Sequence, residues 1–402
     1  RAAHLDSWLH SWVQGGSLAG ASVLVSTAEG EVCYSESGMA DAERKIPLER
    51  DTIFRIYSMT KPITCVAALM LVDRGLLSLD DPIEKWIPEF RAGMRVFVSG
   101  DESNCETAAL ESSVTVHQLM THTSGFSYGF LGAHPCDKIL CGHLAKDIPS
   151  WFRNTSLSEL CAALAKTPLS FQPGTKWHYG FSTDVLGHVV EKVSGKTLPE
   201  FFQSEIFDPL NMCDTGFFVP KEKLHRLAQC YDLKGSNNGY AASTSEERDR
   251  SAMPTFHSGG GGLVSTIDDY MKFALCLLNQ GTANGVCIIS AETLRLMNLN
   301  HLPGGVDMED MAFTSGFSEV VGGGQGFGLG VSVCTNPATA KGSSLSGVGE
   351  FGWGGLASTA FTVDPTKNLA IVFMTQAVPS SVLPVRAHLK WLAHWVVEES
   401  KL

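Results

Sequence analysis

The stretch FRIYSMTKPITCVAALMLVDRGLL, residues 54–77, combines the pattern of a buried helix with two polar side chains near its start. Apolar residues recur at helical spacing from Ile63 onward, and Gly75 is typical of a helix stop. These features predict a helix that begins near Ser58 and is buried along most of its length. Ser58 and Lys61 form the pattern S-x-x-K, and residues three apart share one face of a helix, so the amine can reach the hydroxyl.

The start of a helix changes the chemistry of both side chains. Free backbone N–H groups there favour negative charge on or near the serine oxygen. An apolar setting disfavours the charged form of Lys61, which helps its amine to accept or relay a proton. S-x-x-K also recurs by accident, and the alternative interpretation is an ordinary helix start. Ser58 is therefore a candidate nucleophile whose case depends on the residues around it.

A second serine, Ser127, lies in GFSYG, residues 125–129. This stretch fits G-x-S-x-G, the sharp turn between a strand and a helix that can carry a nucleophilic serine. The preceding residues, VTVHQLMTHTSG, have the spacing of a helix that stops at Ser124 and Gly125, so no buried strand leads into the turn. We therefore interpret Ser127 as a loop serine in a chance match.

Two further stretches supply partners for Ser58. In FQPGTKWHYGFSTDVLGHVVEKVSG, residues 171–195, Tyr179 stands in the turn before a helix. A free tyrosine has a pKa of about 10, but a neighbouring lysine ammonium favours the phenolate, which could take the serine proton. The alternative is a packed tyrosine whose hydroxyl is satisfied.

The second stretch is GEFGWGGLASTAFTVDP, in which Trp353, Gly354 and Gly355 precede a strand. Two glycines permit a close backbone approach. An edge strand beside the nucleophile would offer the N–H of Leu356, paired with the N–H of Ser58, to a developing oxyanion. The alternative is a tight bend with a core tryptophan. HSGGGGLVST, residues 257–266, is equally rich in glycine but carries no lysine for phosphate, and we interpret it as a turn before a helix.

Composition limits the classes of partner. The chain has 402 residues, 44% of them hydrophobic, which is enough for a large core, and a formal net charge of −12, which would repel a phosphate backbone and argues against nucleic acid. The apolar runs are too short to span a bilayer. Eleven scattered cysteines, most of them in apolar stretches, predict reduced, buried thiols and a reducing compartment such as the cytoplasm. Cys136 and Cys141, flanked by His134 and His143, lack a second cysteine pair, so a loop with incidental thiols is favoured over a zinc site.

The order of the elements predicts an α/β (α+β) fold. Strand-like stretches near both termini read as two hairpins, one around AEGE and one around residues 364–368, with a helix at each chain end. We expect one antiparallel sheet flanked by helices, built from residues 1–80 and 251–402. Residues 81–250 read as a largely helical inserted domain, with an active site in the cleft between the two domains.

The combined motifs resemble a known family. YSMTKP, LMTHTSG, the Tyr179 turn followed by DVLG, GGGGLVSTIDDY and WGG before a strand occur in the order seen in serine β-lactamase-like proteins. The likeness covers residues 10–395 and is strongest to class C β-lactamase-related carboxylesterases and to acyltransferases of the same β-lactamase/transpeptidase-like fold. The resemblance implies Ser58 as the acylated nucleophile, Lys61 and Tyr179 as the proton-handling pair, and the N–H groups of Ser58 and Leu356 as oxyanion donors.

The chain departs from the family at two positions. Relatives that bind β-lactams carry an asparagine where this chain has Phe181, and a lysine or histidine where it has Trp353. Both changes remove groups suited to an amide or a carboxylate. We therefore predict esters with a neutral acyl part and poor β-lactam turnover. Candidates for the substrate-binding wall are Trp177, Phe126, Tyr128, Phe130, Phe181, Trp353, Gly354 and Gly355.

Three functions follow from these residues. The first is a serine carboxylesterase that hydrolyses a small-molecule ester through a Ser58 acyl-enzyme. The second is an acyltransferase that passes the acyl group to an alcohol or an amine. The third is a catalytically idle assembly or binding module, against which the intact Ser58, Lys61 and Tyr179 weigh. None of these schemes requires a metal or an organic cofactor.

Overall fold

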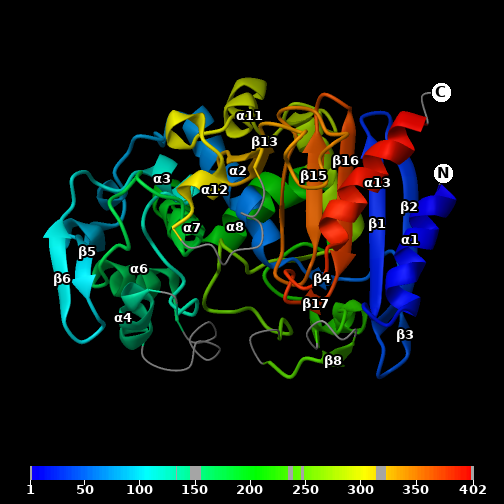
Figure 1. Cartoon of the computed structure of the whole chain (residues 1–402), viewed down its shortest axis with the longest axis horizontal. Helices are drawn as coiled ribbons and strands as arrows, with labels where there is room; N and C mark the ends of the chain where they lie inside the picture. The colour runs from blue at the N-terminus through cyan, green and yellow to red at the C-terminus, as the bar shows by residue number, and fades with distance from the viewer. Residues whose placement is uncertain are drawn as a thin grey trace.

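The computed structural model describes residues 2–132, 134–144, 155–233, 239–245, 249–313 and 323–399. An eight-stranded antiparallel sheet in the order β12-β13-β14-β15-β16-β1-β2-β3 forms one side of the molecule (Figure 1). Its strands are β1 (Gly20–Thr27), β2 (Gly30–Asp41), β3 (Ile46–Pro47), β12 (Gln325–Phe327), β13 (Ser332–Cys334), β14 (Phe351–Gly354), β15 (Ala360–Asp364) and β16 (Leu369–Thr375). The antiparallel sheet built from both chain ends is thus confirmed.

Two neighbouring inner strands, β1 and β16, show why the sheet needs helices on both faces. Val23 of β1 pairs with Phe373 of β16, and both side chains belong to the core under the terminal helices α1 (Ala2–Gln14) and α13 (Val385–Glu399). The neighbouring residues Leu24 and Val372 point to the opposite face, into the main core that also holds residues of α10 (Ile267–Leu278). Nearly every residue of β16 is apolar for this reason.

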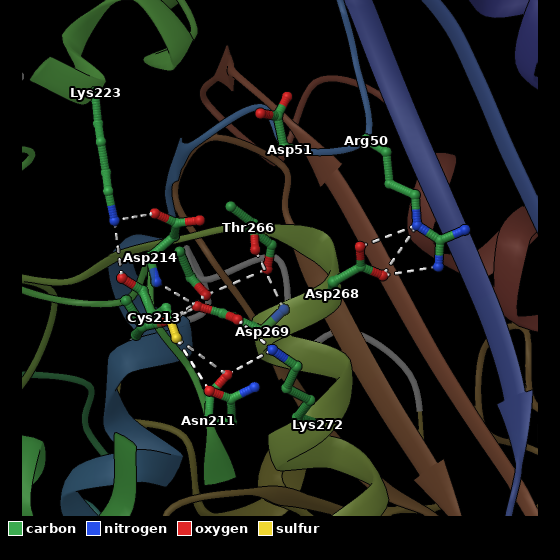
Figure 2. Close-up of polar contacts among 12 residues, drawn as sticks. Arg50, Asp51, Asn211, Cys213, Asp214, Lys223, Thr266, Asp268, Asp269 and Lys272 are labelled. Atoms are coloured by element: carbon green, nitrogen blue, oxygen red, sulfur yellow. Dashed lines mark hydrogen bonds and ion pairs between the residues drawn. The ribbon is translucent and has the colours of Figure 1, made fainter. Parts of the chain in front are cut away.

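Polar contacts fix the start of α10 to its neighbours (Figure 2). The side chain of Thr266 caps the helix by accepting a hydrogen bond from Asp269 N. The carboxylate of Asp269 accepts from Asp214 N at 2.7 Å, and Asp268 forms an ion pair with Arg50. The helix is therefore tied to the segment around Asp214 and to the loop that precedes Ser58.

The remaining elements lie beside the sheet. The helices are α2 (Thr60–Asp73), α3 (Val116–Met120), α4 (Pro135–His143), α6 (Leu157–Ala165), α7 (Ser182–Ser194), α8 (Leu198–Phe202), α9 (Asp208–Leu210), α11 (Ala291–Met297) and α12 (Met308–Met311). Short strands are β4 (Phe54–Arg55), β5 (Arg95–Gly100), β6 (Cys105–Ala109), β7 (Tyr231–Leu233), β8 (Tyr240–Ala242), β9 (Val264–Ser265), β10 (Thr282–Ala283), β11 (Val286–Cys287) and β17 (Ala377–Val378). The β5–β6 hairpin was not predicted; it is only partly buried, so its sequence lacks strong alternation.

Helix α2 lies in the middle of the main core. Every residue from Thr60 to Leu71 is buried, as the apolar pattern predicts. No helix in the described ranges is long and apolar enough to cross a bilayer. All eleven cysteines are free thiols, and seven of them are buried. The boundaries 1–80, 81–250 and 251–402 of the expected domains stay a prediction.

Candidate active site

Ser58 stands at the junction between a short 3₁₀ turn, Tyr57–Met59, and the start of α2. Tyr57, directly before it, has a φ of 44°, which is an unusual and strained backbone conformation for a bulky residue. Ser58 is partly exposed and lines a pocket of about 590 Å³. The fold therefore buries the helix and leaves its first serine accessible.

Lys61 connects Ser58 to the interior. Its Nζ donates hydrogen bonds to Ser58 Oγ at 3.2 Å, to the hydroxyl of Tyr128 at 2.9 Å and to Gly260 O at 2.6 Å. The side chain is 1% exposed. Burial lowers the pKa of Lys61 to about 7, and the negative charge of Asp184 opposes this change only in part. An amine with this pKa exists in both protonation states near neutral pH.

Two tyrosines flank the lysine, and the sequence had singled out one of them for proton transfer. The ring of Tyr179 lies 4.4 Å from Lys61 Nζ, and its hydroxyl accepts a hydrogen bond from Trp353 Nε1 at 3.2 Å. Tyr128, which the sequence assigned to the substrate wall, is the hydrogen-bond partner of the amine. Burial, followed by the nearby Tyr179 and Asp184, raises the pKa of Tyr128 well above its usual value. Tyr128 is therefore a protonated phenol at neutral pH.

The glycine run after Ser258 is part of the site, which the sequence did not predict. The carbonyl of Gly260 holds Lys61, and its N–H donates to Asp184 Oδ1 at 3.1 Å. A Cβ at Gly260 would stand 2.4 Å from the Asp184 carboxylate, so only glycine fits. Ser258 Oγ donates to the same oxygen at 2.5 Å. The sequence offered one signal for this contact, a polar residue, Asp184, near the start of the helix predicted after Tyr179.

The WGG stretch approaches Ser58 as expected, but its strand does not lie at an edge. A Cβ at Gly355 would stand 2.4 Å from Ile56 O, two residues before Ser58. β14 pairs with both β13 and β15, because β12 and β13 extend the sheet beyond it. The expectation of an edge strand was therefore wrong. Leu356 follows in a turn that lines the pocket, and within the described residues its N–H has no hydrogen-bond acceptor.

The predicted wall residues divide into two groups. Tyr128, Phe130, Phe181, Gly354 and Gly355 line the pocket together with Ser58, Tyr179 and Leu356. Phe126, Trp177 and Trp353 are not among its lining residues; they are 2%, 2% and 5% exposed and belong to the main core. The sequence could not separate these aromatic residues because both groups have the same local pattern.

Ser127 lies outside the pocket. It is 4% exposed, donates a hydrogen bond to Asp137 and contacts His178 Nε2 at 3.2 Å. The hydroxyl is committed to a carboxylate and a substrate has no access to it. Its position agrees with the interpretation of GFSYG as a chance match to the nucleophile turn.

The candidate zinc ligands lie on and beside a helix instead of in a loop. Cys136 and Cys141 belong to α4, and the side chain of His134 caps that helix. Within the described ranges they form no group of three ligand atoms close enough for one ion. The capping pattern of His134 and Pro135 was the missed helix signal.

A different cluster, the α13 cluster, consists of Glu350, Asp364, Lys390 and His394. Of the residues that the structure describes, only Glu350, Asp364 and His394 bring three such ligand atoms within 4.8 Å. His394 Nε2 lies 3.2 Å from Glu350 and 3.1 Å from Asp364, and Nδ1 donates to Lys390 O. Burial alone would lower the pKa of His394, but its bonds to the two carboxylates raise it to about 9. The imidazolium and the Lys390 ammonium already neutralise the carboxylates, so the cluster is an internal ion network.

The chain combines an antiparallel sheet with a helical part, and it places a serine at a helix start with a buried lysine three residues later. These features define the class of serine enzymes that carry an S-x-x-K motif. A family model described as beta-lactamase matches residues 5–394, so the chain belongs to the β-lactamase family.

Named relatives cover nearly the whole chain. Esterase EstB of Burkholderia gladioli is 32% identical over 392 residues, which span 93% of this chain and 90% of the esterase. The lovastatin esterase of Penicillium rubens is 31% identical over 403 residues, which span 93% of this chain and 92% of that protein. The structure of simvastatin synthase from Aspergillus terreus matches 99% of this chain and 98% of its own, with a TM-score of 0.81 and 23% identity, which shows a shared fold.

Proposed function

We propose that the protein is a serine carboxylesterase that hydrolyses small esters through an acyl-enzyme on Ser58. The observation that carries this proposal is the 3.2 Å contact between Lys61 Nζ and Ser58 Oγ at the wall of an accessible pocket. A serine hydroxyl is a weak nucleophile until a neighbouring base takes its proton. Lys61, with a pKa of about 7, is partly neutral at physiological pH and is the immediate base.

The first half of the reaction forms the acyl-enzyme. Ser58 Oγ attacks the carbonyl carbon of the ester while its proton moves to Lys61 Nζ. The N–H groups of Ser58 and Leu356 donate to the oxyanion of the tetrahedral intermediate. The bond to the alcohol then breaks, and the proton passes from Lys61 to the leaving oxygen through the hydroxyl of Tyr179, with Tyr128 holding the amine in place.

The second half regenerates the enzyme. Water attacks the acyl carbonyl and gives its proton to the same base, and Ser58 leaves with a proton returned from Lys61. In each half of the reaction Lys61 thus takes a proton from the attacking oxygen and gives it to the leaving oxygen, and the scheme uses no cofactor.

The pocket supports neutral acyl groups. Tyr57, Phe130, Phe181 and Phe256 contribute aromatic surface near Ser58. Phe181 stands where a β-lactam-binding relative would present an amide, and Trp353 lies behind Tyr179. We therefore expect slow turnover of β-lactams compared with short-chain esters.

Acyl transfer to an alcohol or an amine is the second candidate, because the named activities of the relatives are those of esterases and of a synthase. The two candidates share every residue and differ only in the acceptor. Product analysis with a p-nitrophenyl ester and a large excess of candidate alcohols separates them. If free acid is the only product, the protein is an esterase.

The Ser58→Ala variant tests the shared chemistry. It should lose p-nitrophenyl ester hydrolysis altogether, and mass spectrometry of the wild-type protein should find a fluorophosphonate adduct on the peptide that contains Ser58. Hydrolysis that survives in Ser58→Ala, or an adduct on another residue, contradicts the proposal. Absence of any adduct would favour the idle assembly module.

The proposal also covers the class of partner, the compartment and the two expected domains. The partner is a small molecule, since the formal net charge of −12 is unsuited to nucleic acid. Eleven free thiols suit a reducing compartment such as the cytoplasm. We propose that the pocket lies between the two expected domains, a proposal supported by its lining: Ser58 and Leu356 come from residues 1–80 and 251–402, and Tyr128 and Tyr179 come from residues 81–250.

A further inference from the structure

The buried residues Asp137, Ser127 and His178 form a hydrogen-bonded group, here called the Ser127 network. It contains the three residue types of a catalytic serine–histidine–aspartate triad, but the serine, and not the histidine, lies in the middle. Ser127 Oγ donates to Asp137 Oδ1, so it can only accept from His178 Nε2–H, at 3.2 Å. Burial lowers the pKa of His178 to about 4, which keeps the imidazole neutral. The serine thus lies between the other two residues, and none of the three lines the pocket. This arrangement holds groups in place and does not activate a nucleophile.

Each end of the contact between Ser127 and His178 adjoins a tyrosine of the pocket. Ser127 immediately precedes Tyr128, and His178 immediately precedes Tyr179. The two tyrosine rings meet edge to face with centroids 5.4 Å apart, and the Lys61 amine lies 5.5 Å from the centre of the Tyr128 ring and 4.4 Å from that of Tyr179. The hydrogen bond between Ser127 and His178 therefore joins the two backbone segments that carry these rings.

The backbones of the same two segments also touch. Phe181 N donates to Ser127 O at 3.4 Å, and a Cβ at Gly180 would stand 2.3 Å from Phe126 O. Asp137 anchors the pair to α4, because its other carboxylate oxygen accepts from His134 N at 3.1 Å as part of the helix cap. Both tyrosines lie on irregular segments, so their distance from Lys61 depends on such contacts.

We propose that Asp137, Ser127 and His178 are positioning residues that set the distance of Tyr128 and Tyr179 from Lys61. This inference rests on the proposed function, since it concerns the proton path of the same reaction. A displacement of about 1 Å in a reacting group can cost on the order of 100-fold in rate. Loss of the network shifts the two phenols, and with Tyr128 the amine that it holds, while Ser58 and the rest of the wall stay in place, so it lowers kcat far more than it changes KM.

A double-mutant cycle tests this role. Ser127→Ala should lower kcat for p-nitrophenyl ester hydrolysis about 10- to 100-fold, with KM within about twofold of wild type. If Ser127 acts through Tyr128, the same substitution made in Tyr128→Phe should cost less than about threefold more. Ser127→Thr, which keeps the hydroxyl, should recover most of the loss. If Ser127→Ala does not fold, Asp137→Asn takes its place in the double-mutant cycle.

Ser124→Ala is the matched control, because Ser124 is a buried serine of the same loop that hydrogen-bonds Ser182 at 2.8 Å, outside the network. It should keep kcat within about threefold of wild type. The inference is overturned if Ser127→Ala behaves like this control, if its loss adds in full both to that of Tyr128→Phe and to that of Tyr179→Phe, or if a fluorophosphonate labels Ser127. Ser58→Ala reports separately on the proposed function: if it retains activity, the whole reaction scheme fails, whereas the outcomes above remove only the positioning role.

Discussion

The regions around Lys61 and around His394 both bury a cation, and they change its pKa in opposite directions. Lys61 has neutral acceptors within hydrogen-bond distance, and burial lowers its pKa to about 7. His394 contacts two carboxylates, and these raise its pKa to about 9 despite burial. Burial alone therefore does not determine the protonation state of a side chain. The partners decide whether a buried base is available for chemistry or held as a permanent charge.

The two regions also occupy different places in the fold. Lys61 lies behind an accessible serine, whereas the α13 cluster joins the ends of β14 and β15 to the helix that covers the sheet. We infer that the first region serves reactivity and the second serves stability. Each prediction below separates activity from stability on this basis.

The largest expected effect is the loss of the base. Lys61→Met should lower kcat for ester hydrolysis by about 10³-fold or more, since general base catalysis contributes up to about 10⁴-fold. The variant should be at least as stable as wild type to urea, because an apolar side chain replaces a buried amine that has no carboxylate within hydrogen-bond distance. Lys61→Arg is the control: it keeps a cation but cannot release its proton near neutral pH. Activity in Lys61→Arg would contradict the role of Lys61 as a base.

Removal of the imidazolium should affect stability and spare activity. A pKa of about 9 in the folded protein, against about 6.5 in the unfolded chain, corresponds to roughly 3 kcal/mol. Because the folded pKa is the higher one, this contribution is complete below about pH 6.5 and disappears as the pH rises through 9. His394→Gln should therefore lower the free energy of urea unfolding most at pH 6, and the difference from wild type should shrink toward pH 9.

The activity of His394→Gln completes that test. Its kcat at 25 °C should stay within about twofold of wild type, because no atom of the α13 cluster touches Lys61 or Ser58. A fall in kcat as large as that of Lys61→Met would show that the two regions are coupled, and the division between them would fail.

The two phenols should give intermediate effects. Tyr179→Phe removes the proposed proton relay, and Tyr128→Phe removes the acceptor that holds the amine; each should lower kcat about 10- to 100-fold. Steady-state kinetics with p-nitrophenyl acetate measures both losses, and Phe130→Leu is a control from the same wall. Wild-type kcat in Tyr179→Phe would leave Tyr128 as the relay.

The sequence predicted the part of the site that rests on local spacing. Ser58 and Lys61 are three residues apart on a helix, so their contact needs no knowledge of the rest of the fold. The bond between Tyr128 and Lys61 joins residues far apart in sequence and depends on how a loop packs, and Tyr128 was accordingly placed only in the wall. Gly260 was interpreted as a turn for the same reason.

The sheet could be predicted because short runs rich in apolar and β-branched residues, bounded by turn residues, mark β1, β15 and β16. The α13 cluster gave no such signal. Its residues at 350, 364, 390 and 394 come from two strand ends and a helix, and polar residues at such places usually lie in solvent. Tertiary packing alone brings them together.

The pH dependence of Ser58 labelling tests the central claim most directly. The rate of fluorophosphonate addition to Ser58, followed by mass spectrometry under pseudo-first-order conditions, should rise with pH and reach half its maximum near pH 7, where Lys61 becomes neutral. Lys61→Met should label far more slowly, without this rise. A wild-type rate that stays constant from pH 5 to 9, or a rise that persists in Lys61→Met, would contradict the account.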